Sequence, residues 1–229
     1  MMWKLVWEWL HGAAFCFASC GEGSARPFWS DLFSRKKGKL SMTIDAAFTH
    51  FPSLITNRLH LRQIQPTDAE AFFAIKSDLE VTRRYGQEPH QSIDDTHAWI
   101  QRLQASYYRR EALFWCLTLK GESSVVGSCT FWNFGAGFHC AEIGYELHRA
   151  YWRQGIMAEA ISAILTYGFT ELGLHRIEAN PLAENTASKS LLLKLGFTYE
   201  GNLRQRHFFR DHFEDQLYFG MLKEEWLKS

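Results

Sequence analysis

The chain has 229 residues, 46% of them hydrophobic, so it is long and apolar enough to build one sizeable core. Lysine plus arginine and aspartate plus glutamate number 25 each, which excludes the basic excess typical of a direct nucleic-acid binder. The five cysteines are an odd number and contain no C-x-x-C pair, so neither a disulfide framework nor a zinc site is predicted. We expect reduced, buried thiols in a cytoplasmic protein.

The first 41 residues differ from the rest of the chain. They are rich in tryptophan and phenylalanine, and their longest uncharged stretch, 12–21, is far shorter than the ~20 residues that span a bilayer. We predict that residues 1–41 are a dispensable extension, either disordered or added by an upstream start codon, and that no membrane is involved. A signal peptide or membrane anchor at 1–20 is the alternative. Residues 42–229 are predicted to form one domain, with its core at about 54–225.

The domain is predicted to open with a strand and two helices. Residues 57–64 alternate apolar and polar side chains like a strand. A helix is expected over 69–78, after a Pro-Thr-Asp start. A loop follows, and a capping-box sequence beginning at Ser92 opens a second helix that runs to about Arg110.

Three antiparallel strands are predicted next. Residues 112–120 and 124–134 flank a Gly-Glu-Ser turn and read as a hairpin, and 140–148 is a further strand. Side chains alternate across this last strand, because successive residues of a strand point to opposite faces. One face carries Ala141, Ile143, Tyr145 and Leu147, and the other carries Glu142, Gly144 and Glu146.

The C-terminal part alternates helix and strand. From Gly155 the apolar period becomes helical, with a predicted buried stripe of Ile161, Ile164, Leu165, Gly168 and Leu172. A short strand over 175–181 and a helix over 184–197 follow. The inner face of that helix is predicted to carry Ala187, Leu191 and Leu195. Two aromatic strands in 197–222 complete an α/β domain.

The turn before the helix at Gly155 has the features of an anion site. A helix N-terminus leaves its first N–H groups unpaired and carries partial positive charge, which suits phosphate oxygens. Gly155 permits close backbone approach because it has no Cβ, and Arg153 adds charge. An ordinary tight turn with solvent-facing arginines fits the same residues, so this stretch alone does not decide between the two.

Five segments, in order, resemble the Gcn5-related N-acetyltransferase (GNAT) family, and more narrowly its RimJ/RimL-like branch of ribosomal-protein Nα-acetyltransferases. They are RLHLRQI, EIGYEL, YWRQGIMAEAI, HRIEANPLAENTASKSLLLKLGF and EGNLRQ. The resemblance covers roughly 54–225. It implies the GNAT fold, an α/β arrangement with a mixed, mostly antiparallel sheet that is flanked by helices and splayed between its fourth and fifth strands.

The resemblance also implies acetyl-CoA as co-substrate and no metal. Residues 152–157 stand where the family has its pyrophosphate loop, R/Q-x-x-G-x-G/A. Trp152 and Met157 depart from that pattern, and we interpret them as features of the branch, since main-chain N–H groups do the holding. The pantetheine arm is expected between the splayed strands, against the main chain near Tyr145 to Leu147. The implied cofactor-binding residues are Tyr145, Leu147, Arg153, Gln154, Gly155, Ile156, Met157, Ala158 and Asn185.

The candidate catalytic residues are Glu142 and Ser188. Acetyl transfer to an amine needs a base, and Glu142 is the candidate, acting through water, with Glu146 as its rival and a plain ion-paired carboxylate as the alternative. Ser188 matches a position from which members of the branch donate to the sulfur, although a serine there also suits a helix start. Asn185 likewise fits both a pantetheine contact and an N-cap. No covalent intermediate is expected.

The acceptor site is predicted between the first two helices, their loop at 83–92 and the closing strands, where Glu88 or Asp215 would attract an amine. The resulting hypothesis is direct transfer of the acetyl group to a primary amine, foremost a protein or peptide N-terminus such as that of a ribosomal protein. A small acceptor (drug, polyamine or amino-acid-like) and a non-catalytic CoA-binding module are the alternatives. The protein is expected to be a monomer or homodimer.

Overall fold

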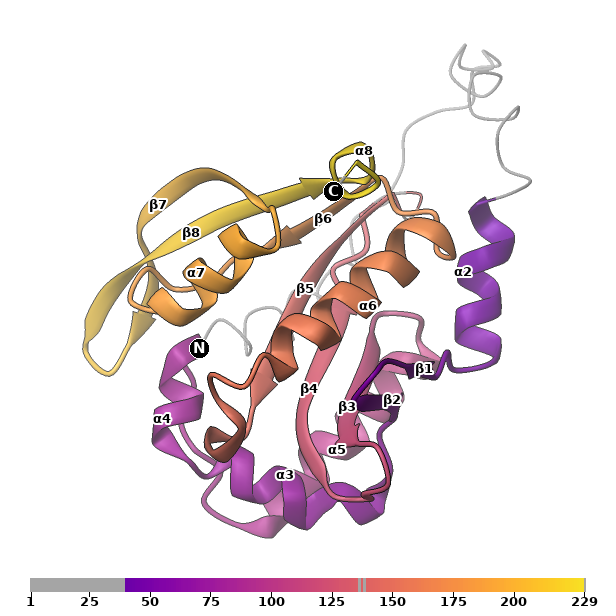
Figure 1. The fold of residues 1–229 in the computed structure, drawn as a ribbon. Helices are drawn as coiled ribbons and strands as arrows, with labels where there is room; N and C mark the ends of the chain where they lie inside the picture. Colours follow the sequence, from indigo (N-terminus) through magenta and orange to yellow (C-terminus); the bar gives the residue numbers. More distant parts are fainter. Residues whose placement is uncertain (1–39, 136, 138, 229) are drawn as a thin grey trace, which may run out of the picture.

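The computed structural model describes residues 40–135, 137 and 139–228. They form an eight-stranded mixed sheet, in the order β1-β2-β3-β4-β5-β6-β8-β7, with helices on both faces (Figure 1). The predicted extension 1–41 lies outside the described residues, except for Leu40 and Ser41. No helix in the described ranges is long and apolar enough to cross a bilayer.

Each of the first five strands pairs antiparallel with the next, from β1 to β5. They are β1 Leu54–Ile55, β2 Leu59–Gln63, β3 Leu113–Leu119, β4 Val125–Trp132 and β5 Cys140–Leu147. The predicted hairpin is confirmed as β3–β4. In β3 both faces are buried, because Trp115 packs with the large cluster around α6 while Phe114 packs with α3 and α5. The apolar run of this strand reflects its place in the middle of three layers.

The sheet splits beside β5. Strand β6, Arg176–Ala179, runs parallel to β5 and pairs with only its first three residues, Cys140, Ala141 and Glu142. Residues 143–147 continue past the last pair, so β5 and β6 diverge (Figure 1). The two-residue β1 adds one strand to the predicted count, and the predicted splay therefore lies between the fifth and sixth strands here. Over residues 143–147, the edge of β5 that faces β6 is therefore left unpaired.

The long helices follow the apolar pattern of the sequence. The helices are α2 Leu40–Thr49, α3 Ala69–Lys76, α4 Leu79–Thr82, α5 Ile93–Tyr108, α6 Ile156–Thr170, α7 Thr186–Lys194 and α8 Lys223–Trp226. Short 3-10 turns lie between some of these elements: η1 Pro66–Asp68, η2 Arg83–Tyr85 and η4 Arg149–Tyr151. The predicted start of α5 is confirmed, since Ser92 Oγ accepts from Asp95 N–H at 3.2 Å and Asp95 accepts from Ser92 N–H at 2.9 Å. All five residues of the predicted α6 stripe are buried.

The predicted inner face of α7 is wrong by one residue. Ser188 and Leu192 are buried, Ala187 is exposed, and Leu191 and Leu195 are only half-buried. The run of three leucines at 191–193 fits more than one helical phase, and packing into the large core cluster buries Leu192.

The last two strands form a long arm. They are β7 Thr198–Phe209 and β8 His212–Leu222, joined by a turn in which Arg210 and Asp211 have φ of 47° and 63°. Two successive left-handed residues are what a two-residue hairpin turn of type I′ requires. The prediction of two aromatic strands around Asp211-His212 is confirmed. Because β8 pairs with β6, the arm projects along the far side of the split (Figure 1).

Candidate active site

The loop between β5 and α6 forms a backbone cradle. Arg153 and Gly155 both have left-handed φ, 61° and 73°. The first backbone hydrogen bond of α6 runs from Glu159 N–H to Gly155 O, at 3.1 Å. The N–H groups of residues 156–158 precede it and have no helical acceptor. A turn of this shape, opening a helix, presents several N–H groups to one anion.

Three residues outside the predicted motif, Thr56, Arg58 and Glu159, hold this cradle in place. Glu159 accepts from Thr56 Oγ at 2.5 Å, from Arg58 N–H at 2.7 Å and from Arg58 Nε at 2.6 Å, and Arg58 Nη1 donates to Gln154 O at 2.9 Å. Burial raises the pKa of Glu159, but the bonds from Thr56 and Arg58 outweigh it and the net pKa is lowered. Arg58 therefore brings a cation to this backbone cradle from a segment about a hundred residues away. Sequence reasoning missed it.

Trp152 has a local role that explains its departure from the motif. Its indole Nε1 donates to the carbonyl of Leu147 at 2.8 Å, which ties the η4 turn to the end of β5. This bond uses one lone pair of the Leu147 carbonyl oxygen. A carbonyl oxygen has two lone pairs, so the other can still accept a hydrogen bond. The predicted main-chain contacts of Tyr145 and Leu147 lie on the unpaired edge of β5.

The start of α7 faces the split from the other side. Asn185 is the N-cap: its Oδ1 accepts from Ser188 N–H at 3.1 Å, and its Nδ2 donates to Arg84 O at 3.0 Å. The N-cap interpretation of Asn185 is therefore the one that the structure shows, and a pantetheine contact would have to share the same amide. Ser188 Oγ lies 2.7 Å from the phenol oxygen of Tyr145. These contacts connect β5, α7 and the η2 turn.

Glu142 is a half-buried carboxylate near the closed end of the split. It accepts from Asn133 Nδ2 at 2.6 Å and is paired in register with Glu178 of β6. Burial raises its pKa, the hydrogen bond from Asn133 opposes this, and the neighbouring Glu178 raises it further, with a net rise. The ring of Trp132 covers the adjacent Gly144, where a Cβ would lie 2.4 Å from it. Glu142 thus has the perturbed environment typical of a catalytic carboxylate.

Glu146, the rival base, is engaged in a buried network. Its carboxylate pairs with Lys76 Nζ at 2.8 Å and accepts from Tyr85 Oη at 2.9 Å and Ser128 Oγ at 3.1 Å. The Lys76 and Glu146 side chains are 8% and 6% exposed. A carboxylate held in this way joins α3 and the η2 turn to the sheet. Of the two carboxylates, Glu142 is the better placed to accept a proton.

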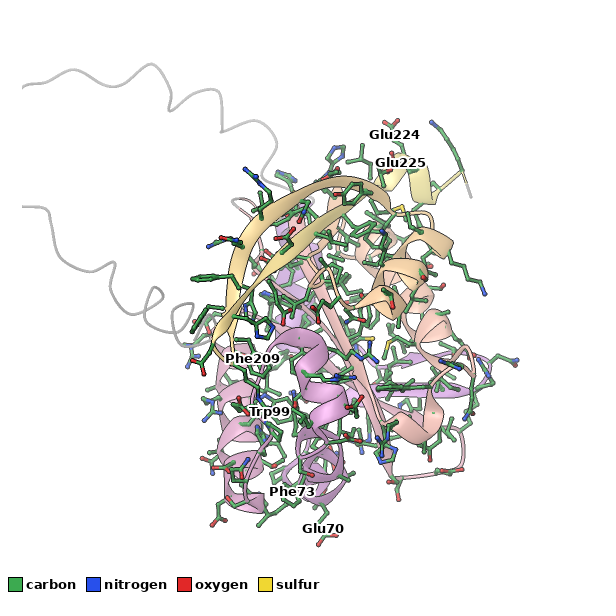
Figure 2. The ribbon with its side chains drawn as sticks, turned by 90° about the vertical axis from the view of Figure 1, so that its left-hand side faces the viewer. Glu70, Phe73, Trp99, Phe209, Glu224 and Glu225 are labelled. Atoms are coloured by element: carbon green, nitrogen blue, oxygen red, sulfur yellow. The ribbon has the colours of Figure 1, made fainter. Side chains whose placement is uncertain are left out.

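A groove of about 290 Å³ lies where the acceptor site is predicted. It is lined by Leu79, Arg83, Arg84, Glu184, Asn185, Phe209, Arg210, His212 and Glu214. One wall is the α4–η2 segment and the other is the tip of the β7–β8 arm, and Figure 2 shows Phe209 at that tip, on the side of the helices that carry Phe73 and Trp99. A larger hollow, about 640 Å³, is bounded by residues 202–206 of β7 alone and is an open surface at the sheet edge.

The two carboxylates predicted to attract an amine are already engaged. Glu88 accepts from Arg210 Nε at 2.9 Å and from Nη2 at 2.6 Å, which fastens the η2–α5 loop to the tip of the arm. Asp215 accepts from Asn202 Nδ2 at 2.7 Å and Gln205 N–H at 2.8 Å. Neither carboxylate lines the groove: Glu88 holds Arg210, which does line it, and the carboxylates in the lining are Glu184 and Glu214.

Comparison with known proteins agrees with this geometry. Residues 58–198 match the family described as Acetyltransferase (GNAT) domain. The N-acetyltransferase YoaA of Bacillus subtilis is 44% identical over 155 residues, which cover 68% of this chain and 88% of that protein. The [ribosomal protein uS5]-alanine N-acetyltransferase of Escherichia coli is 26% identical, over 76% of this chain and 92% of that protein.

A solved structure completes the comparison. RimJ of Mycobacterium smegmatis, in complex with CoA-disulfide, superposes with a TM-score of 0.65 at 28% identity, covering 73% of this chain and 83% of that one. The cradle at 153–158 and the open edge of β5 fit a CoA-type ligand, because they offer donors for a pyrophosphate and a strand edge for an amide-containing arm. The chain therefore belongs to the GNAT family of acetyl-CoA-dependent N-acetyltransferases, with relatives in the RimJ/RimL-type branch.

Proposed function

We propose that this enzyme acetylates the N-terminal amine of a protein or peptide by direct attack in a ternary complex. The observation that carries the proposal is the placement of three features on one strand–loop–helix unit. Glu142 lies at the closed end of the split, the free edge of 143–147 follows, and the cradle at Gly155 ends the unit. An extended CoA arm lying along that edge would bring its acetyl group toward Glu142.

The chemistry can be assigned to named groups. Glu142 takes the proton of the incoming amine through water, so that a neutral nitrogen attacks the thioester carbonyl. The tetrahedral intermediate then collapses, the C–S bond breaks, and Ser188 stabilises the leaving thiolate by a hydrogen bond. The thiols of Cys116 and Cys129 take no part: burial raises the pKa of both, which keeps them protonated.

The groove supports a peptide as the acceptor. It extends from Asn185, beside the split, to the tip of the arm, and its lining mixes arginine, glutamate and aromatic side chains. This space could receive the residues that follow an acceptor amine, whereas a small amine would leave it empty. The ribosomal-protein activity of the Escherichia coli relative supports the same class of acceptor.

A turnover panel tests the acceptor. We expect peptides with a free N-terminal alanine, serine or methionine to give a kcat/KM about tenfold or more above that of spermidine or an aminoglycoside, a difference of about 1.4 kcal/mol. The same peptides with a blocked N-terminus and an internal lysine are the control and should be inactive. Preference for a polyamine, or for the lysine, would contradict the proposal.

The Glu142→Gln variant should lose turnover and keep acetyl-CoA binding. Removing a general base costs typically about 10²–10⁴-fold in rate. The raised pKa also sets the pH dependence: wild-type kcat should fall as pH drops through that pKa, because the carboxylate becomes protonated, and this acid limb should be missing in the variant. A pH series of initial rates, with calorimetry for acetyl-CoA, measures both effects.

Glu178→Gln is the matched control for this experiment. Glu178 is the register neighbour of Glu142, but it is bound by Arg176 Nε at 2.6 Å. The variant should therefore be nearly silent in turnover at neutral pH, and should only move the acid limb to lower pH, because Glu178 no longer raises the pKa of Glu142. If Glu142→Gln retained normal turnover at neutral pH, Glu142 would not be the base.

A further inference from the structure

Two hydroxyl groups meet across the split in the sheet. Tyr145 lies on the unpaired part of β5, and Ser188 lies in the first turn of α7, 43 residues further along the chain. Their oxygens are 2.7 Å apart. Ser188 is 8% exposed, and its backbone N–H is held by Asn185. The pair stands between the two elements that border the predicted path of the pantetheine arm.

The proton count of this pair leaves one donor for a ligand. Each hydroxyl carries one proton and can accept from others. One proton is used in the bond between them, and the described residues offer neither hydroxyl another acceptor. A second O–H proton thus remains free to point toward a bound group.

The burial of Tyr145 determines the protonation state of its phenol. Burial raises the pKa of its phenol, the bond to Ser188 opposes this, and the nearby Cys129 raises it further, so that the phenol stays neutral throughout the physiological range. A neutral phenol keeps its proton, so Tyr145 can donate a hydrogen bond but is not a source of protons for a thiolate. A hydroxyl that accepts from a neighbour becomes a better donor itself, because hydrogen bonds in a chain polarise one another.

We propose that Tyr145 is a positioning residue for acetyl transfer: its phenol donates to Ser188 Oγ and thereby directs the Ser188 O–H toward the sulfur of the leaving CoA. This inference rests on the proposed function. As the C–S bond breaks, its electron pair moves to sulfur, and Ser188 stabilises the thiolate by a hydrogen bond without transferring its proton. The proton released by the amine resides on Glu142 or the solvent.

The test measures the ionisation of CoA bound to the enzyme. The thiolate is followed by its ultraviolet absorbance as the pH is raised, in complexes with wild type, Tyr145→Phe, Ser188→Ala and the double variant. We expect each single change to raise the pKa of the bound thiol by about one unit, a tenfold loss of thiolate stabilisation, as for one hydrogen bond to a charged group. The double variant should add little, because both residues act through one bond.

Two controls separate this proposal from the proposed function. Desulfo-CoA should bind all variants equally, since it lacks the sulfur, and equal binding also shows that the variants fold. Tyr199→Phe, which removes a phenol from the 48%-exposed position on β7, should leave the thiol pKa unchanged.

The outcomes are distinct. Failure of wild type to bind CoA would overturn the proposed function. If CoA binds but Tyr145→Phe leaves the thiol pKa where it was, Tyr145 has no positioning role. A shift in Tyr145→Phe without one in Ser188→Ala would also overturn the proposal, because Tyr145 would then contact the sulfur directly.

Discussion

Acetyl-CoA is expected to bind the Gly155→Glu variant about 100-fold or more weakly than wild type. A new carboxylate at this position would stand before the N–H groups of residues 156–158 and repel the pyrophosphate, and juxtaposed like charges cost several kcal/mol. Space is not the obstacle, because a Cβ at Gly155 would lie an ordinary 3.5 Å from Arg58 Nη2. The new carboxylate would also compete for that guanidinium. Isothermal titration with acetyl-CoA measures the loss.

Gly155→Asn and Gly155→Ala are the controls. The φ of 73° strains a residue with a Cβ, by roughly 1–2 kcal/mol for alanine, and asparagine tolerates it better. We expect Asn to stay close to wild type, Ala to lose some affinity, and Glu to lose most. Equal loss in all three would point to backbone conformation instead of charge, and no loss in any would refute the cradle.

Lys76→Met is expected to lower the free energy of unfolding far more than the loss of a surface charge would. It removes the cationic partner of Glu146 at a site where both side chains are less than a tenth exposed. Breaking a buried ion pair on one side costs about 3–5 kcal/mol, because the remaining charge is left uncompensated. Lys76 also lies over the Trp99 ring at 4.4 Å, and methionine would keep part of that packing. Urea unfolding followed by tryptophan fluorescence gives the free energy.

The double variant Lys76→Met/Glu146→Gln checks the cause. A neutral glutamine can still accept from Tyr85 and Ser128, so we expect it to recover about half or more of the loss. Glu80→Gln, which removes the exposed partner of Arg83, is the surface comparison and should cost less than about 1 kcal/mol. Additive losses in the double variant would show that the two charges do not depend on each other.

Much of the fold was accessible from the sequence because it rests on local rules. The β3–β4 hairpin, the capped start of α5 and the apolar stripe of α6 each follow from residues that are close together in the sequence. The α7 face was mispredicted because a leucine run has no unique phase. Strand alternation correctly separated Tyr145 from Glu142 and Glu146.

The partners of the site residues were not accessible in this way. Alternation assigns Glu142 and Glu146 to one face, but says nothing about what lies opposite. Only the folded chain shows that Glu146 is held by Lys76, whereas Glu142 retains a perturbed pKa beside Asn133. The same holds for Arg58 at the cradle, which no local pattern connects to Gln154.

The family, the order of elements and the phosphate cradle follow from the amino-acid sequence, because a cradle is made of consecutive backbone N–H groups and a glycine that frees φ. Tertiary packing pairs Glu146 with Lys76 and leaves Glu142 as the proposed base, lets Asn185 cap its helix while holding Arg84, and brings Tyr145 to Ser188. The last two of these pairings join residues about 40 to 100 positions apart. Side chains so distant in the chain become neighbours only when the sheet splits and the helices close over it.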